Sequence, residues 1–580
     1  MTQFAAWPDS NNTESILQAI DTLPAEQHPY LSRQLIAYIG NKRALLPFLQ
    51  RVFSRLHHER AVRTFLDPFA GSGSVARLAR WMGFAVHAND WEYYAYVLNR
   101  AFVTADAQQA DRLFAAEGGL GAVIGELNSL HGAPTTAYIS RHYAPRCSRS
   151  ADYRRERLFY THENAEFIDR VRSAIEDRYP ADSGILEREL QRALLIAALL
   201  YQAATHANTS GVFKAYHKGF GGHGGDALRR ILNPMQLQQP LLIDREQRCS
   251  ASMRDAADCS GSYDLVYLDP PYNQHQYGSN YFMLNTIARW DCPPVDQQRL
   301  ADGSLRVKAG IRADWVQTRS AYCSRRGAAA EFERLLDSLD TPRLVLSYNA
   351  QGIIELPQLI EICSRHGHVE IDATDYVRYR GGRQSLTRRS GNHEFVLIVR
   401  RQKRSGRRTD IAGFLARRGI AELSGRTFAP ARLRQVAGSR SACFDAAGRP
   451  VVLHFDPLYR LSSHGLSEQL DNCDGAALQQ LLQQLQNAVC VDHAEEAELL
   501  LQLLGQTSES DNALCGRDAR AAVAHLLRCL RKLAHRKYRT QFEALCGCAR
   551  DLGLRQAERF SGLAGEIDSL EELARKRRAG

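Results

Sequence analysis

The residues best suited to chemistry form the tetrad Asp269-Pro270-Pro271-Tyr272, which directly follows the apolar segment 265–268. An amino nitrogen on a nucleobase is a poor nucleophile because its lone pair is delocalised into the ring. The Asp269 carboxylate can accept one hydrogen bond from such an amine, and the Pro270 carbonyl, fixed by the rigid Pro-Pro step, can accept the other. Tyr272 offers a ring on which a base that has left its duplex can stack. Taken alone, the tetrad could also be a structural proline turn.

A glycine-rich loop, 67–74, follows an apolar segment at 64–66 and precedes a helical pattern. Glycines let a backbone turn sharply and approach a ligand closely. The next strand pattern ends at Asp90, where folds of this type hold a ribose diol. No Lys-Ser/Thr pair follows Gly73, which excludes a P-loop, and the third spaced glycine of a dinucleotide site is missing. Together with the tetrad, the loop predicts S-adenosylmethionine (SAM) as cofactor.

The tetrad also indicates which amine is methylated. Methylation at carbon 5 of cytosine needs a cysteine nucleophile in a Pro-Cys context, and neither Pro145-Arg146-Cys147 nor Cys292-Pro293 fits. An aspartate at position 269 favours N6 of adenine over N4 of cytosine, where serine is more usual. The residues therefore predict an enzyme that methylates adenine N6 from SAM.

Short apolar strands alternating with helical patterns would position these residues. The strand patterns are 64–66, 85–88, 265–268, 344–346 and 395–399. Apolar runs bounded by Gly, Pro and Asp are typical of a buried, mostly parallel sheet. We expect an α/β fold with a doubly wound, Rossmann-like sheet of the SAM-dependent methyltransferase kind, a helical insertion and a mainly helical C-terminal domain.

The pattern changes divide the 580 residues into five expected parts. These are an N-terminal arm (1–30), the first, SAM-binding part of the catalytic domain (31–100), a mainly helical insertion (101–248), the second part with the tetrad (249–402) and a mainly helical domain without an assigned role (403–580). Within the last part, a strand pair is expected around 441–455, and no carboxylate–Glu-x-Lys pattern of a nuclease is evident.

The charge distribution favours a polyanionic partner. The net charge is +10, and the segment 376–408 carries eleven Arg or Lys residues against one acid, Glu394. We expect Arg378, Arg380 and Arg383 to contact phosphates, although a solvated loop is the alternative.

The cysteines and the apolar segments indicate where in the cell the protein resides. The 13 cysteines show no disulfide framework and are expected to be reduced. Cys490 with His493, and Cys546-Gly547-Cys548, lack the paired spacing of zinc sites, so no metal is predicted. No run is long enough to span a bilayer, and the N-terminus lacks a signal-peptide pattern, so we expect a cytoplasmic protein without membrane contact.

These residues resemble the D12-class (α-group) adenine-specific DNA methyltransferases, the Dam-like class that includes many restriction–modification methylases. The similarity includes a lysine-bearing motif, 38–43, before the glycine loop, and the continuation of the tetrad through 273–277. Ser347-Tyr348-Asn349 and the segment 208–218 also fit. The resemblance covers about residues 31–402.

The resemblance implies roles for individual residues. Tyr38 and Lys42 would border the cofactor and the active site, and Asp90 would bind the ribose. Phe69, Gly71 and Gly73, beside Asp67, would contact the methionine part of SAM, and Asp255 would bind its adenine. The insertion would recognise the target, with Asn208, Lys214, Tyr216 and Lys218 as contacts to double-stranded DNA. The setting implied is either a restriction–modification system, with a cognate restriction endonuclease as functional partner, or a phage or mobile element.

Two other functions fit parts of the pattern. RNA and protein-glutamine N-methyltransferases share a Pro-Pro-Tyr tetrad, but they generally lack a motif such as 38–43 before the glycine loop. A non-catalytic DNA-binding protein with a relict SAM domain is the second alternative. The intact Asp269, Tyr272 and Asp90 argue against it.

Overall fold

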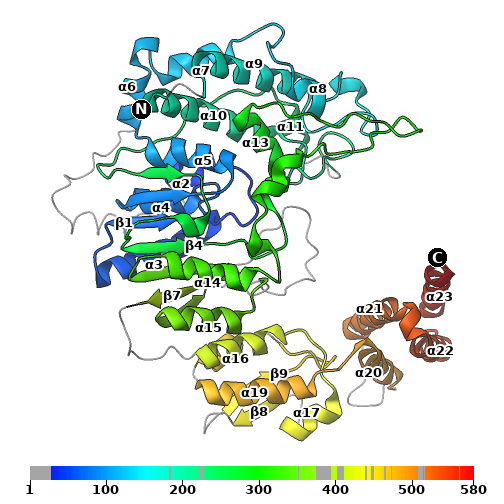
Figure 1. Cartoon of the computed structure of the whole chain (residues 1–580). Helices are drawn as coiled ribbons and strands as arrows, with labels where there is room; N and C mark the ends of the chain where they lie inside the picture. Colours follow the sequence, from blue (N-terminus) through cyan, green and yellow to red (C-terminus); the bar gives the residue numbers. More distant parts are fainter. Residues whose placement is uncertain are drawn as a thin grey trace, which may run out of the picture. The chain divides into compact units, whose positions relative to one another are not determined.

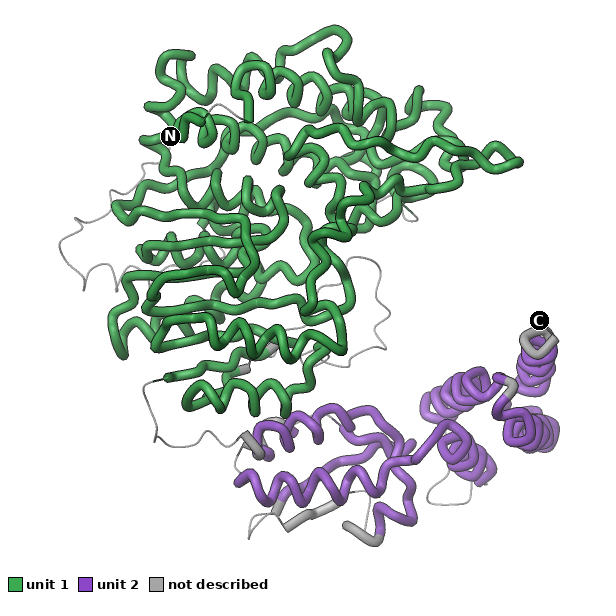
Figure 2. The backbone as a smooth tube through the Cα atoms, viewed as in Figure 1, with its two compact units in different colours: residues 1–407 green, residues 408–580 purple. Residues whose placement is uncertain are grey.

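The computed structural model describes residues 28–181, 184–222, 227–349, 352–373, 394–401, 411–437, 441–445, 450–462, 466–471, 473–506, 514, 516–560 and 562–579. The chain divides into two compact units, residues 1–407 and 408–580 (Figure 2). None of the helices in these ranges combines the length and the apolar character needed to traverse a membrane.

Unit 1 is built on a seven-stranded sheet of order β3-β2-β1-β4-β5-β7-β6 (Figure 1). Its strands are β1 (Thr64–Asp67), β2 (Ala85–Asn89), β3 (Ser250–Ser252), β4 (Leu265–Leu268), β5 (Arg343–Asn349), β6 (His368–Ala373) and β7 (Glu394–Arg400). The first five are parallel, whereas β7 runs antiparallel to both β5 and β6. The predicted α/β class with a mostly parallel sheet is confirmed, and β3 and β6 are strands that the sequence patterns did not predict.

Burial explains why the central strands form continuous apolar runs in the sequence. Every residue of β4 and β5 is buried, as expected for parallel strands covered on both faces. Helices α3 (Leu46–Glu59) and α4 (Ser74–Trp81) share one apolar core with alternate residues of β1 and β4. Helix α15 (Leu356–His366) packs on β6 and β7, beside α14 (Ala328–Ser338).

The helical insertion packs into the same unit. Its helices are α6 (Ala107–Leu113), α7 (Leu120–Asn128), α8 (Ile139–Tyr143), α9 (His162–Arg178), α10 (Leu186–His206) and α11 (Leu228–Leu232). All but α11, which packs on α10, share a second apolar core with α5 (Tyr93–Asn99), α12 (Tyr277–Asn280) and α13 (Phe282–Arg289). Because α5 follows β2, and α12 and α13 follow the tetrad, this core joins the insertion to the carboxyl edge of the sheet. The short α2 (Pro29–Ser32) precedes α3.

The described residues of unit 2 form eight α-helices and two strands. They are α16 (Ile411–Glu422), α17 (Pro430–Ala437), β8 (Ser441–Asp445), β9 (Pro450–His454), α18 (Leu466–Asp471), α19 (Gly475–Ala488), α20 (His493–Gly505), α21 (Gly516–Leu533), α22 (Arg539–Arg555) and α23 (Leu563–Ala579). Strands β8 and β9 form the predicted antiparallel pair. One apolar core joins α16, α17, α18 and α19 to β9, and another joins helices α20, α21, α22 and α23.

Candidate active site

The carboxyl ends of β1, β2 and β4 border one cleft. From these ends come Pro68 and Phe69, the segment 90–92 and the whole tetrad 269–272. Because neighbouring parallel strands run in the same direction, their carboxyl ends meet at one edge of the sheet, where doubly wound folds bind ligands. The segments 38–40 and 254–256 complete the walls together with Thr318, Ser320 and Tyr322. The tetrad and the glycine loop therefore face a shared cavity.

At two positions the glycine loop adopts a backbone conformation that residues with a side chain rarely adopt. Gly71 and Gly73 have φ angles of 52° and 80°, in the left-handed region. A Cβ on Gly71 would lie 2.9 Å from Cε1 of Tyr38, and one on Gly73 would lie 2.8 Å from Oδ1 of Asn99. The amide nitrogen of Gly71 donates to Asp90 (2.8 Å), and Nδ2 of Asn99 donates to the Gly71 carbonyl (3.1 Å). The loop is thus held from two sides.

Two carboxylates follow β2 at the wall of the cleft. Asp90 accepts a hydrogen bond from the backbone N–H of Glu92 (2.9 Å), and Glu92 accepts one from Nδ2 of Asn285 on α13 (2.5 Å). Burial raises the pKa of Asp90 to about 6 and that of Glu92 to about 7. Above these values, both side chains are ionised acceptors that suit hydroxyl or amino donors.

The catalytic end of the cleft is organised by a buried ion pair. Nζ of Lys42 lies 3.0 Å from Oδ1 of Asp269, and the two side chains are 3% and 17% exposed. The same ammonium donates to the Gly40 carbonyl (3.2 Å) and lies 5.3 Å from the ring centroid of Tyr272. Tyr272 in turn packs edge-on against Tyr348, with ring centroids 5.9 Å apart. The predicted tetrad residues are therefore held next to Lys42.

Tyrosines connect the segment before α3 to the helices after the tetrad. The Tyr38 ring stacks on Tyr281 with a centroid distance of 4.9 Å, and its hydroxyl lies 3.2 Å from that of Tyr94. The Tyr281 hydroxyl accepts a hydrogen bond from the N–H of Ile39 (2.7 Å), and the Tyr277 hydroxyl donates one to the carbonyl of Ile39 (3.1 Å). These contacts place Tyr38 at the wall of the cleft.

Among the residues that line the cleft, carboxyl groups outnumber cationic ones: Asp90, Glu92, Asp255 and Asp269 accompany Arg254. Burial raises the pKa of Asp67 well above its ordinary value, and the nearby carboxylates of Asp269 and Asp90 raise it further. Within the described part of the chain, neither Asp67 nor Asp90 has a Lys or Arg partner within 4 Å. Such a site favours a cationic ligand and disfavours a phosphate.

Asp255 also lines the cleft, where it begins a short 3-10 turn. Its side chain accepts from the N–H of Ala257 (2.9 Å) and from Nη2 of Arg334 (2.9 Å). Phe69 packs edge-on against Tyr322, with ring centroids 5.2 Å apart. Both predicted residues thus lie where a ligand in the cleft would reach them.

Two of the residues expected to contact DNA have internal roles instead. Asn208 is fully buried, and its Nδ2 donates to the carbonyls of Leu158 (3.0 Å) and His217 (3.3 Å). The expectation that Asn208 contacts DNA is therefore wrong for this conformation, because its amide anchors the loop before Lys218. The hydroxyl of Tyr216 likewise donates to backbone carbonyls within the insertion.

The remaining expected DNA contacts are exposed or lie elsewhere. Lys214 and Lys218 are exposed, and Nζ of Lys218 lies 5.6 Å from the ring centroid of Tyr153. The three arginines of the basic run, Arg378, Arg380 and Arg383, lie outside the described residues.

Several residues at the site had no sequence signal. Glu92 and Asn99 belong to the segment around α5, and Asn285 and Tyr281 lie on or next to α13. Polar or aromatic residues within helical patterns carry no mark of function. Only the proximity of Glu92 to Asp90 could have indicated one of them.

Comparison with known proteins gives a consistent result. The family model described as "D12 class N6 adenine-specific DNA methyltransferase" matches residues 38–308. The type II methyltransferase M.NlaIII of Neisseria lactamica is 31% identical over 364 residues, which cover 62% of this chain and 97% of that protein. The modification methylase LlaI of Lactococcus lactis subsp. lactis is 29% identical over 62% of this chain and 54% of its own length. The type II methyltransferase M.CviAII of Paramecium bursaria Chlorella virus 1 is 24% identical over 60% of this chain and 93% of its own length.

Proposed function

The chain belongs to the D12 class of N6 adenine-specific DNA methyltransferases, and from that premise we propose the complete reaction and its setting. The protein transfers the methyl group of S-adenosylmethionine to N6 of an adenine flipped out of double-stranded DNA. It serves as the modification enzyme of a restriction–modification system, alongside a cognate restriction endonuclease. The single observation that carries this proposal is the cleft shared by Asp90, the Lys42–Asp269 pair and Tyr272.

The residues at the cleft suit S-adenosylmethionine in chemical type. The cofactor is a cationic sulfonium whose bound form supplies an electrophilic methyl group. The carboxyl groups of Asp90, Glu92 and Asp269 line the cleft, and the sulfonium charge would favour their ionised forms. Asp90 would accept from the ribose hydroxyls, and Tyr38 and Phe69 would contact the apolar parts. Asp255 would hold the cofactor adenine. At Gly71 and Gly73, where a Cβ would meet Tyr38 and Asn99, the backbone can approach the methionine part.

The tetrad would hold the target amine. Asp269 and the Pro270 carbonyl accept its two N–H hydrogen bonds, which directs the nitrogen lone pair toward the methyl donor. Lys42 fixes the carboxylate through Oδ1. The charge of Asp269 also stabilises the positive charge that develops on the nitrogen during transfer. Tyr272 would stack on the extruded base.

The proposal divides the work among the parts of the chain. Residues 31–100 would bind the cofactor, and residues 249–402 would carry out the methyl transfer. The insertion 101–248 would recognise the target through exposed side chains such as Lys214 and Lys218. The basic run with Arg378, Arg380 and Arg383 would neutralise phosphates.

The test compares substrates and one catalytic variant. The purified chain, with labelled S-adenosylmethionine, is incubated with duplex DNA, RNA or a protein extract. The label transferred to each substrate is counted, and the methylated product is identified by mass spectrometry. We expect methylation of duplex DNA alone. Asp269→Ala should abolish methylation while keeping cofactor affinity in calorimetry, whereas Asp177→Ala, on the exposed face of α9, should behave as wild type. Methylation of RNA or protein in preference to DNA would overturn the proposal.

A further inference from the structure

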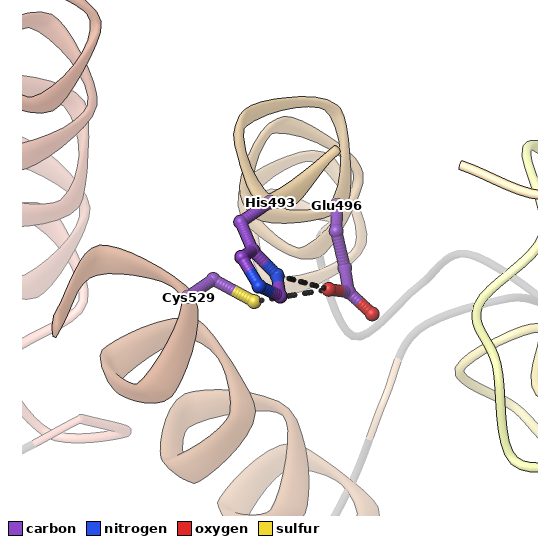
Figure 3. A group of neighbouring side chains, drawn as sticks. All are labelled: His493, Glu496 and Cys529. Atoms are coloured by element: carbon purple, nitrogen blue, oxygen red, sulfur yellow. Dashed lines mark hydrogen bonds and ion pairs between the residues drawn. The ribbon is translucent and has the colours of Figure 1, made fainter. Parts of the chain in front are cut away.

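Metal-ligating side chains meet in unit 2, where the first turn of α20 faces α21 (Figure 3). His493 and Glu496 are three residues apart on α20, so they lie on the same face of that helix. Nδ1 of His493 lies 3.2 Å from Oε2 of Glu496, and Sγ of Cys529 on α21 lies 3.3 Å from the same oxygen. The three potential ligand atoms all lie within 4.8 Å of one another.

We propose that His493, Glu496 and Cys529 bind a divalent transition-metal ion, zinc in preference, that fastens α20 to α21. Imidazole nitrogen, carboxylate oxygen and thiolate sulfur are the three protein ligands that zinc takes, at distances of about 2.0–2.3 Å. A tetrahedron with such bonds has edges of about 3.3–3.7 Å. The 3.2 Å and 3.3 Å separations at Glu496 are close to those edges, so an ion enters with small side-chain movements.

The surroundings of Glu496 hold its carboxylate in the orientation that a ligand needs. Its other oxygen, Oε1, accepts from Oγ1 of Thr427 (2.6 Å) and lies 3.1 Å from Nε2 of His525. Partners of this kind orient ligating carboxylates in metal sites. His525 lies four residues before Cys529 on the same face of α21, and its Nδ1 is buried without a hydrogen-bond partner among the described residues.

Burial and charge agree with an ion at this place. Cys529 is 2% exposed, whereas the His493 side chain is 53% exposed. The ion would therefore be anchored from the core and open to solvent on one side, where a water completes four-coordination. One carboxylate and one thiolate balance a double positive charge, so the occupied cluster is electrically neutral. A buried thiol releases its proton when it binds such an ion.

The spacing along the chain explains why the sequence did not predict this site. Cys490, His493 and Glu496 follow one another at intervals of three residues, but this half lacks a second pair nearby in the sequence. His525 and Cys529 supply the other half from the next helix. The site lies outside residues 38–308, which the family model matches, so it is a property of unit 2 and independent of the proposed methyl transfer.

The experiment uses the full-length chain, purified without a histidine tag and without chelators. Zinc per chain is measured by plasma mass spectrometry, and cobalt(II) is titrated into metal-stripped protein. We expect about one ion per chain, with the near-ultraviolet absorption of a thiolate–cobalt bond and the visible bands of a tetrahedral ion. Cys529→Ser should remove the thiolate absorption and weaken zinc binding at least tenfold. His493→Ala should weaken zinc binding similarly.

Two controls separate a metal site from a general effect on folding. Cys546→Ser removes another buried thiol of the same core, on α22, and should keep full metal content. His493 is largely exposed, so His493→Ala tests the site without opening the core. The proposal is overturned if wild-type protein binds neither zinc nor cobalt in stoichiometric amount. It is equally overturned if His493→Ala and Cys529→Ser, folded by circular dichroism, bind zinc as tightly as Cys546→Ser.

Discussion

Nζ of Lys42 lies 3.0 Å from Oδ1 of Asp269, although the insertion 101–248 separates the two residues in the sequence. Both side chains are largely buried, so each compensates the other's charge where solvation is weak. The pair joins the motif before the glycine loop to the tetrad. These two segments are therefore held together at one end of the cleft.

The first prediction concerns this pair. Lys42→Ala removes the cation that fixes the Asp269 carboxylate, and we expect kcat for DNA methylation to fall by roughly 10²–10³-fold, as when one preorganised polar partner is removed from an active site. Single-turnover methylation of a duplex substrate measures the effect. Lys532→Ala, at an exposed position on α21 of unit 2, should leave the single-turnover rate within a few-fold of wild type. A Lys42→Ala rate equal to that of wild type would contradict the role assigned to the pair.

The second prediction concerns the ring of Tyr272. Base–aromatic stacking is worth about 1–3 kcal/mol, so Tyr272→Ala should weaken binding of the flipped base by about 5–150-fold. Tyr272→Phe keeps the ring and should stay close to wild type. The fluorescence of 2-aminopurine at the target position reports base extrusion. Equal fluorescence and equal activity for the Ala and Phe variants would rule out stacking on this ring.

The tetrad and the glycine loop could be predicted because their signals are local. Each is a short polar turn directly after an apolar strand, and parallel strands bring such turns to one edge of the sheet. The strands β3 and β6 were missed for a related reason. Ser250-Ala251-Ser252 contains no β-branched or aromatic residue. Strand β6 lies at the edge of the sheet and alternates polar and apolar residues, so it lacks the continuous apolar run by which the buried strands were recognised.

Contacts made by helices could not be predicted in the same way. The stack of Tyr38 on Tyr281 and the hydrogen bond from Asn99 to Gly71 depend on how α5 and α13 pack on the insertion. A helical pattern does not specify the neighbour of a polar side chain. For Asn208, a DNA contact was expected from the family resemblance and was not found. Its side-chain amide donates to backbone carbonyls in the interior instead.

The third prediction concerns the anchor of the glycine loop. Asn99→Ala removes hydrogen bonds to the carbonyls of Gly71 (3.1 Å) and Ala95 (2.8 Å). Each such bond contributes about 1 kcal/mol, so we expect the KM for S-adenosylmethionine to rise about five- to thirtyfold with a smaller change in kcat. Gly73→Ala should have a similar or larger effect, because its Cβ would meet Asn99.

A matched substitution distinguishes loop positioning from general destabilisation. Asn128 on α7 also donates to a backbone carbonyl, that of Leu237 (3.1 Å), but within the insertion. Asn128→Ala should lower the melting temperature without raising the KM for the cofactor. If Asn99→Ala and Asn128→Ala raise this KM equally, Asn99 has no specific role at the loop.

The fourth prediction concerns the salt dependence of DNA binding. A cationic side chain that neutralises one phosphate adds about 0.9 to the magnitude of the slope of log K against log salt concentration. Replacing Arg378, Arg380 and Arg383 together by Ala should therefore reduce the slope by about 2–3 and weaken specific and non-specific DNA binding alike. Fluorescence anisotropy between low and moderate salt measures the slope. Arg365→Ala, at an exposed arginine already paired with Glu361, should leave it unchanged. An unchanged slope in the triple variant would exclude these phosphate contacts.

The last prediction is a pH dependence of cofactor binding that originates at Asp90. Burial raises the pKa of this carboxyl to about 6, so it is ionised at pH 8 and becomes protonated as the pH falls through 6. Ribose hydroxyls donate to the ionised form, so affinity is retained above the pKa and falls by about tenfold per pH unit below it. Calorimetry at pH 5, 6, 7 and 8 measures the affinity for S-adenosylmethionine.

Asp90→Asn should bind the cofactor more weakly at pH 8 and lose the dependence centred on pH 6. Glu92→Gln is the matched control, because the pKa of Glu92 is raised to about 7 and this variant should alter only the part of the profile near pH 7. A wild-type affinity that is equal at pH 5 and pH 8 would contradict a ribose contact at Asp90.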